Sequence, residues 1–168
     1  MKIVAAVARK RSQRGNTLME ATAILLLMLG LLFLIVDISL ATFTKATLQQ
    51  AAEAGVRFAV TDQLASGQSY MNDSIVQVVQ QNSMGMLNGA NGACKVAISY
   101  FNPITGAAST GAGGDVVQVS VTGYNYTPVG ILKSASPIPI TASSSDVMES
   151  CPLGGCPPMA NPTPPTCP

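Results

Sequence analysis

An uncharged, strongly apolar run from Ala21 to Val36 follows a single glutamate, Glu20, near the start of the chain. These sixteen residues span about 24 Å as an α-helix, and flanks broken only by Asp37 extend the run to the thickness of a bilayer. A carboxylate at the border of a membrane helix costs free energy, so it usually has a partner or a role in recognition. The sequence therefore predicts one membrane-spanning helix over residues 16–44, with Glu20 near its beginning.

The basic residues gather ahead of this run. Five of the nine, Lys2, Arg9, Lys10, Arg11 and Arg14, lie in the first fourteen positions, and all acidic residues follow them. The positive-inside rule then places the N-terminus in the cytoplasm and the chain beyond the helix outside. Without residues 1–15, four basic and eight acidic side chains would remain, so the side-chain charge would change from +1 to −4. Such a chain lacks the basic patch of a nucleic-acid-binding protein, and no nucleic-acid partner is expected.

Gly15, the polar Asn16 and then Glu20 stand between the basic segment and the apolar run. This order resembles the cleavage signal of type IV prepilins and pseudopilins. In that family a membrane aspartyl peptidase cuts after the Gly on the cytoplasmic face, and the apolar run remains as anchor and assembly stem. The resemblance implies a cut between Gly15 and Asn16, residues 1–15 as a basic leader, and prepilin peptidase as a partner. Gly also leaves the backbone accessible and commonly ends a helix, so a change of conformation is expected there.

Two other interpretations of the N-terminal segment stay open. An ordinary secretory signal could be cut after Ser39-Leu40-Ala41, although the apolar run exceeds the usual length of roughly 7–15 residues and a glutamate at its border is atypical. An uncleaved single-pass anchor is the other interpretation. Prepilin-type processing is favoured over both. For Asp37, near the outer interface, a solvated or snorkelling side chain is favoured over a packing contact.

Helical periodicity continues beyond the membrane run, from Ile38 to about Val60, without a proline. One face carries small residues (Ala41, Ala51, Ala52, Ala54, Gly55 and Ala59), and another carries polar ones (Lys45, Gln49, Gln50 and Glu53). The pattern predicts one long helix. Packing of its small-residue face against the chain's own domain is favoured over a seam between subunits.

Two motifs of this helix, Ile35-Val36-Asp37-Ile38 and a second one containing Ala54-Gly55-Val56-Arg57, resemble the TadE-like family of pilus-assembly proteins. Those proteins are pseudopilin-like components of the Tad (tight adherence, Flp pilus) machinery, a branch of type IVb pili. The resemblance covers about the first sixty residues, and Ala21-Thr22 departs from the larger apolar or aromatic residue that the family often has after its glutamate.

The resemblance implies a minor pilin or pseudopilin in the bacterial inner membrane, with a periplasmic or extracellular C-terminal domain. Other pilins or pseudopilins and the Tad inner-membrane assembly proteins would be its partners. In pilins, the carboxylate at the position of Glu20 recruits or aligns a neighbour through the freed N-terminal amine, which gives Glu20 an assembly role. Whether the protein enters the filament or stays in the membrane scaffold is left open.

The pattern of residues 45–150 predicts one small extracytoplasmic domain, and the expected fold class is α+β. A helix capped by Asp73 or Ser74 is expected to end near Gly85 or Gly89. Three strands follow from alternating apolar residues at Val96, Ile98 and Tyr100, at Val117, Val119 and Val121, and at Ile138, Ile140 and Ala142. The long helix is expected to cover one face of this small antiparallel sheet, as in pilin-like folds.

Two segments are predicted to lack regular structure. The low-complexity connection Asn102–Gly114 is expected to be flexible, and it lacks the Gly-Lys-Ser/Thr that a phosphate-binding loop requires. Residues 151–168 hold seven of the eleven prolines and predict an extended tail. An exposed terminus is favoured over a partner-binding segment.

All four cysteines, Cys94, Cys151, Cys156 and Cys167, lie after the membrane run. An oxidising compartment favours disulfides among them, with three possible connectivities, and a bridge from Cys94 to the tail is preferred. The chain has no histidine and no Cys-x-x-Cys pair, so neither a zinc site nor another cofactor is expected.

The lack of histidine also excludes Ser-His and Cys-His nucleophilic arrangements. Asp115 and Asp146 border predicted strands and are interpreted as turn or edge residues. No catalytic residue is therefore expected, and an anchored extracytoplasmic enzyme is strongly disfavoured. The main alternative to a pilus-assembly subunit is a secreted or membrane-anchored adhesin or binding module.

Overall fold

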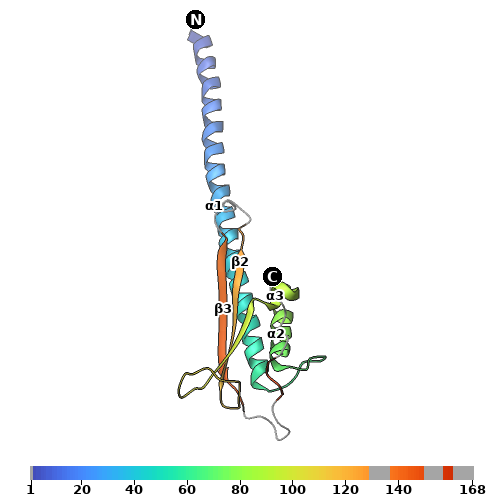
Figure 1. Ribbon diagram of the computed structural model, residues 1–168. Helices are drawn as coiled ribbons and strands as arrows, with labels where there is room; N and C mark the ends of the chain where they lie inside the picture. The colour runs from blue at the N-terminus through green and yellow to red at the C-terminus, as the bar shows by residue number, and fades with distance from the viewer. Residues whose placement is uncertain (1, 129–136, 150–156, 161–168) are drawn as a thin grey trace. The chain divides into compact units, whose positions relative to one another are not determined.

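The computed structural model describes residues 2–128, 137–149 and 157–160, with side chains from residue 17 onward. Its elements are α1 (Lys2–Val60), α2 (Met71–Asn82), α3 (Gly89–Ala93), β1 (Val96–Phe101), β2 (Val116–Tyr126) and β3 (Ile138–Val147) (Figure 1). The predicted α+β class is confirmed. The chain divides into two units, one formed by residues 1–41 with 127–136 and the other by residues 42–126 with 137–168.

In the first unit, the part of α1 from Ala21 to Val36 is apolar on all sides. Its large side chains from Leu18 to Leu40 are exposed around the whole helix, with exposed fractions between 40% at Leu34 and 77% at Met19. A helix with this pattern needs an apolar solvent such as a bilayer. Among the described residues, one helix, Thr17–Val60, is long and apolar enough to cross a membrane, with a mean hydropathy of 2.8 in its most apolar stretch. The single candidate membrane helix predicted from the sequence is therefore present.

The hydroxyl groups of this helix bond to its own backbone. Thr22 Oγ1 donates to the Leu18 carbonyl at 2.8 Å, and Ser39 Oγ donates to the Ile35 carbonyl at 2.7 Å. Such bonds satisfy a polar side chain inside the helix, so it needs no partner in lipid.

The helix does not end at Gly15. It begins at Lys2 and continues without a break to Val60, so the expected change of conformation at Gly15 is wrong. The flanking residues contain no proline, and one internal glycine costs only about 1 kcal/mol relative to alanine, which a long helix tolerates.

In the second unit, the three predicted strands form an antiparallel sheet in the order β1-β2-β3. Val96 pairs with Val121 at one end of β1, and Phe101 pairs with Val116 at the other. The register between β2 and β3 shifts between Val121 and Tyr124. Gly123 lies in this irregularity with a φ of 71°, a backbone conformation that glycine adopts without strain.

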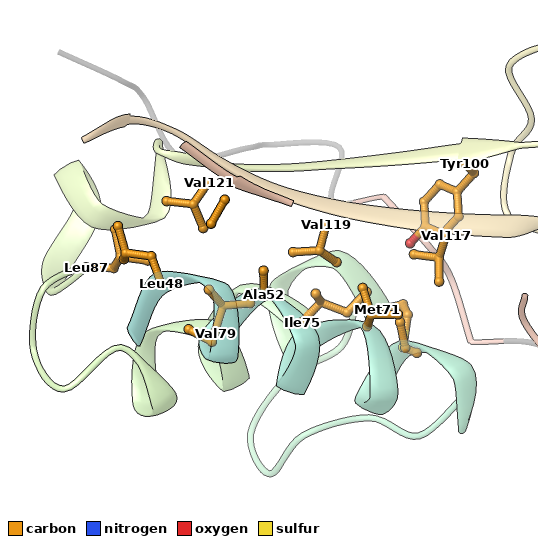
Figure 2. Close-up of a cluster of buried hydrophobic side chains, with 14 of the residues drawn as sticks. Leu48, Ala52, Met71, Ile75, Val79, Leu87, Tyr100, Val117, Val119 and Val121 are labelled. Carbon is orange, nitrogen blue, oxygen red and sulfur yellow. The ribbon is translucent and has the colours of Figure 1, made fainter. Parts of the chain in front are cut away.

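The hydrophobic core lies between one face of the sheet and the helices. Figure 2 shows side chains of β2 directed toward side chains of α1 and α2. The buried residues include Leu48, Ala51, Ala52, Val56 and Ala59 of α1, Met71, Ile75 and Val79 of α2, and Val117, Val119 and Val121 of β2. The small-residue face of α1 thus packs within its own domain, as predicted. Gln49, expected on the polar face, is half-buried and donates through Nε2 to the Ser143 carbonyl of β3 at 2.9 Å.

Gly55 allows a close approach of α1 and α2 in this core. A Cβ atom at Gly55 would lie 2.5 Å from Val79 Cγ2, 3.5 Å from Ile75 Cγ2 and 3.6 Å from Val119 Cγ1. The first of these distances is far shorter than a van der Waals contact. A glycine at this position therefore lets α1 lie directly against α2 while both contact β2.

The predicted cap of α2 is wrong. The helix begins at Met71, so Asp73 and Ser74 lie inside it, and the residue at the cap position, Tyr70, makes no side-chain cap bond. Ser74 instead donates through Oγ to the Tyr70 carbonyl at 2.9 Å and accepts a hydrogen bond from the backbone N–H of Ala65. The short helix α3 was not predicted either.

Residues of the tail take over the role of the cap. The backbone N–H groups of Met71 and Asn72 donate to the carbonyls of Pro158 and Met159, each at 2.9 Å. These are two of the donors that the first turn of a helix leaves without an intrahelical partner. Met159 is half-buried and packs against the core, so this part of the tail is not an exposed terminus.

The connection from β1 to β2 contains defined turns, contrary to the prediction of a flexible loop. Asn102 Oδ1 accepts the N–H groups of Ile104 and Thr105 at 2.9 and 3.2 Å. Asp115 Oδ2 accepts the N–H of Ala112 at 2.8 Å, which confirms Asp115 as a turn residue. Asparagine and aspartate side chains commonly fix turns in this way, and these bonds outweigh the low complexity of the segment.

Replacement of Gly55 by alanine tests the packing of α1 on α2. We expect Gly55→Ala to lower the free energy of unfolding by about 1–2 kcal/mol. At a contact of 2.5 Å the overpacking penalty lies in the upper half of the range of about 1–3 kcal/mol, and it exceeds the gain of about 1 kcal/mol in helix propensity. Thermal and denaturant unfolding followed by circular dichroism measures the change. Glu53→Ala, on the exposed face of the same helical turn, is the control and should stay within about 0.5 kcal/mol of the parent. A Gly55→Ala protein as stable as the parent would contradict the close contact.

Candidate functional site

The residues of the predicted cleavage signal lie on α1. The peptide bond between Gly15 and Asn16 is part of the continuous helix, and the side chains of these two residues lie outside the described ones. Glu20 is exposed, one helical turn and about 6 Å along the axis from Asn16. Its carboxylate is therefore accessible to a second molecule.

Asp37 lies in a different environment on the same helix. Its side chain is 3% exposed and takes part in an interaction within the protein, so the favoured prediction of a solvated or snorkelling carboxylate is wrong. Asp37 lies seventeen positions after Glu20, which is about 26 Å of helix and close to the hydrocarbon thickness of about 30 Å. The two carboxylates thus bracket the apolar segment, and of the two only Glu20 is exposed.

The motif Ala54-Gly55-Val56-Arg57 divides between the core and the surface. Gly55 and Val56 are buried in the core, Ala54 is half-buried, and Arg57 is exposed in the last turn of α1. A positive charge in the last turn of a helix is favourable because the helix dipole is negative there. The buried half of the motif supports helix packing, and none of its residues lies near Glu20 along the helix.

Two polar residues with unusual surroundings, Tyr100 of β1 and Asp62 just after α1, were not predicted from the sequence. Tyr100 donates through its hydroxyl to Asn72 Oδ1 at 2.7 Å, which joins β1 to the first turn of α2. Burial, and secondarily the charge of Asp62, raise the pKa of Tyr100 to about 12. Asp62 is 8% exposed, and neither of its carboxylate oxygens has a hydrogen-bond partner.

Burial raises the pKa of the Asp62 carboxyl above its ordinary value, and the charge of Glu149 raises it further. Sequence reasoning missed this group because Thr61-Asp62 follows the last turn of a helix, where polar residues are usually solvated. Only the tertiary structure buries it.

Cys94 follows α3 and is disulfide-bonded. The other three cysteines, Cys151, Cys156 and Cys167, lie outside the described residues. Within residues 2–128, 137–149 and 157–160, no group of three or more His, Cys, Asp or Glu side chains is placed to hold a metal ion.

These features define a class of protein: one candidate membrane helix continues into an α+β domain and forms part of its core. Residues 15–57 match the family model described as TadE-like protein. The match runs from Gly15 to Arg57 and includes Glu20 and Asp37. Over this segment the chain is similar to TadE-like proteins, as predicted. Comparison with curated proteins and with solved structures gave no match.

The raised pKa of Tyr100 gives a pH dependence with a defined sign. The folded protein holds the phenolic proton more tightly than the unfolded chain, so this contribution to stability is complete below about pH 10 and is lost as the pH rises through about 12. We expect Tyr100→Phe to be less stable than the parent by about 1 kcal/mol at neutral pH, because Asn72 loses its donor. The difference should shrink between pH 10 and 12.

Denaturant unfolding of both proteins at several pH values measures this difference. Tyr70→Phe, which removes the hydroxyl of another tyrosine, is the control. A Tyr100→Phe difference that stays constant up to pH 12 would rule out the raised pKa.

Proposed function

We propose that this chain is a minor pilin or pseudopilin that acts in the assembly of a Tad (Flp, type IVb) pilus. One observation carries the proposal: within the TadE-like segment, Glu20 is an exposed carboxylate at the border of a helical stretch, Ala21 to Val36, that is apolar on all sides. Such a carboxylate is costly in lipid, by about 2.5–3.5 kcal/mol at the bilayer centre and less near its edge. A partner on a neighbouring subunit removes much of this cost.

The partner in the proposal is the N-terminal amine that cleavage creates. Prepilin peptidase cuts between Gly15 and Asn16 on the cytoplasmic side and removes the basic leader. Gly15 has the lowest helix propensity of the residues around the cut, so α1 can open locally there for the peptidase. The freed amine of Asn16 then lies at the border of the apolar segment, close to the depth of Glu20.

Pairing between the amine of one subunit and Glu20 of the next aligns the two helices. Two opposite charges 4 Å apart attract by about 1 kcal/mol in bulk water and about 4 kcal/mol at an effective dielectric constant of 20. The interaction is therefore strongest where water is excluded, as between helices in a membrane or filament. An unassembled subunit carries the unpaired carboxylate, and an assembled one does not.

The same proposal assigns the topology. The helix anchors the protein in the inner membrane, with its N-terminus in the cytoplasm and the α+β domain in the periplasm or on the cell surface. The basic leader supports this orientation. Other pilins or pseudopilins and the Tad inner-membrane assembly proteins are the partners.

In that oxidising compartment, we propose that the disulfide of Cys94 connects to one of the three tail cysteines. Two observations support the bridge: Cys94 is disulfide-bonded, and two tail carbonyls bond to the first turn of α2. Such a bridge would hold the tail against the domain that it caps.

Replacement of Glu20 by glutamine tests the assembly role. The amide keeps the size of the side chain and removes its charge, so we expect normal membrane insertion and protein level but a loss of pilus assembly of tenfold or more. Sheared pili quantified by immunoblot, together with electron microscopy of cells, measure the effect.

Glu53→Gln is the matched control, since it removes an exposed carboxylate from the same helix outside the apolar segment, and it should assemble normally. Normal pili in the Glu20→Gln strain would remove the carboxylate from the mechanism and favour the adhesin alternative.

A further inference from the structure

The sheet of the α+β domain has a defined direction along α1. Figure 2 shows Leu48 of α1 and Val121 of β2 at the same end of the core. Farther along α1, a Cβ atom at Gly55 would lie 3.6 Å from Val119 Cγ1. Between these points α1 runs opposite to β2, and because β2 and β3 are antiparallel, α1 runs in the direction of β3.

A hydrogen bond to β3 gives the same direction. Gln49 Nε2 donates to the Ser143 carbonyl at 2.9 Å, and Val119, beside Gly55, pairs with Ser144. Later residues of α1 therefore lie beside later residues of β3. The end of the sheet where β2 stops and β3 begins points toward the N-terminal side of α1.

This end reaches the point where the exposed apolar surface of α1 stops. Six positions of β3 separate Ser144 from Ile138, which is about 20 Å of strand. Thirteen positions of α1 separate Gly55 from Thr42, which is about 20 Å of helix. Phe43, the next residue, is apolar and 53% exposed. The beginning of β3 is therefore level with the last exposed apolar side chains of α1.

Phe43 lies at the depth of lipid headgroups if Glu20 marks the other border of the bilayer. It follows Glu20 by 23 positions, which is about 35 Å of helix. This length falls between the hydrocarbon thickness of about 30 Å and the thickness of about 40–45 Å with headgroups included. The end of the β2–β3 sheet then lies at the same depth.

The side chains at this end suit a membrane interface. Tyr124 pairs with Ile140 and Tyr126 pairs with Ile138, so both tyrosines share the face of the sheet that carries the core. Both are half-buried at the edge of that core, and Ile138 is 43% exposed. Tyrosine is enriched at membrane interfaces because its ring is apolar and its hydroxyl group is polar.

Two lysines lie at the same end. Lys95 Nζ is 5.3 Å from the centroid of the Tyr124 ring, and the Lys95 carbonyl accepts the N–H of Thr122 at 2.8 Å. Lys45 is exposed on α1, one helical turn before Gln49 and on the same side of the helix. Lysine side chains of this kind extend along apolar surface and place the ammonium group among headgroups.

The acidic side chains of the domain lie farther from the membrane segment. The described ones from Thr42 onward are Glu53, Asp62, Asp73, Asp115, Asp146 and Glu149. Three of them flank the opposite end of the sheet, where Val116 pairs with Val147. On the membrane side, Asp37 is buried and engaged within the protein. The domain is thus polarised, with positive charge toward the bilayer.

We propose that this membrane-proximal end, defined by Lys45, Lys95, Tyr124 and Ile138, lies on the outer surface of the bilayer and binds anionic phospholipid headgroups. The two ammonium groups contact lipid phosphates, and the tyrosine ring and Ile138 lie at the boundary with the acyl chains. These contacts hold the domain at a fixed height above the membrane. The inference rests on the membrane anchor of the proposed function and does not depend on entry into a pilus.

Tryptophan fluorescence of the full-length chain in lipid nanodiscs tests the inference, because the chain has no tryptophan of its own. Tyr124→Trp keeps an aromatic ring beside Lys95, and brominated acyl chains quench a tryptophan that touches them. We expect brominated phosphatidylglycerol to lower the emission of Tyr124→Trp about twofold or more, since tryptophan also favours the interface. Ile138→Trp, at an exposed position, is a second reporter with the same expectation. Tyr70→Trp, at the start of α2, is the control and should keep its emission.

Replacement of single charges tests the role of the lysines. In the Tyr124→Trp chain, we expect quenching by brominated phosphatidylglycerol to exceed quenching by brominated phosphatidylcholine. Lys45→Gln and Lys95→Gln should each lower this preference, by up to about fivefold, the effect of one lysine near an anionic surface. Arg57→Gln is the matched control, since it removes an exposed positive charge from the other end of the same helix, and it should leave the preference unchanged.

Phe33→Trp separates failure of this inference from failure of the membrane anchor. Phe33 is exposed within the apolar stretch of α1, so its replacement should be quenched by both lipids. Quenching of Phe33→Trp without quenching of Tyr124→Trp and Ile138→Trp would overturn the lipid contact and leave the anchor in place. Equal quenching of Tyr70→Trp, or a lipid preference that survives both lysine replacements, would also overturn it. An unquenched Phe33→Trp would contradict the anchor and the lipid contact together.

Discussion

The contact of Gly55 with Val79 allows α1 to serve as part of the extramembrane core. Because position 55 has no side chain, α1 and α2 approach closely, and Val119 of β2 lies beside the same glycine. The sheet can then bury one face against two helices. Each large apolar side chain that is fully buried there stabilises the fold by roughly 1.5–3 kcal/mol. Farther toward its N-terminus, the same helix is apolar on all sides and suited to a bilayer. One continuous element thus meets two solvents, and its residue pattern changes with them.

Three carboxylates along the chain illustrate how environment sets the role of a charge. Glu20 is exposed among apolar side chains, so its charge is available to another subunit. Asp37 is buried and engaged within the protein. Asp62 is buried without a hydrogen-bond partner, and burial, followed by the charge of Glu149, raises its pKa. Residue type alone does not separate these cases, because all three carboxylates border or interrupt a helical segment.

The sequence predicted the features that depend on local pattern. Alternating residues such as Val117, Val119 and Val121 located the strands, and the small-residue face of α1 indicated where it packs. The features that were predicted wrongly or not at all depend on contacts between residues distant in sequence. The cap of α2 comes from backbone carbonyls of the tail, and backbone atoms carry no signal in the side-chain pattern. The burial of Asp37 and Asp62 likewise results from tertiary packing, so neither was predicted. The cleavage signal is local, and the structure does not test it.

The proposed assembly role of Glu20 depends on cleavage after Gly15, since the freed amine is its partner. The most direct measurement is the N-terminal sequence of the mature protein, isolated from membranes of cells with and without prepilin peptidase. We expect a chain that begins at Asn16 only when the peptidase is present, and a chain that keeps residues 1–15 when it is absent. A chain that begins at Thr42, or that keeps Met1 in the presence of the peptidase, would contradict it.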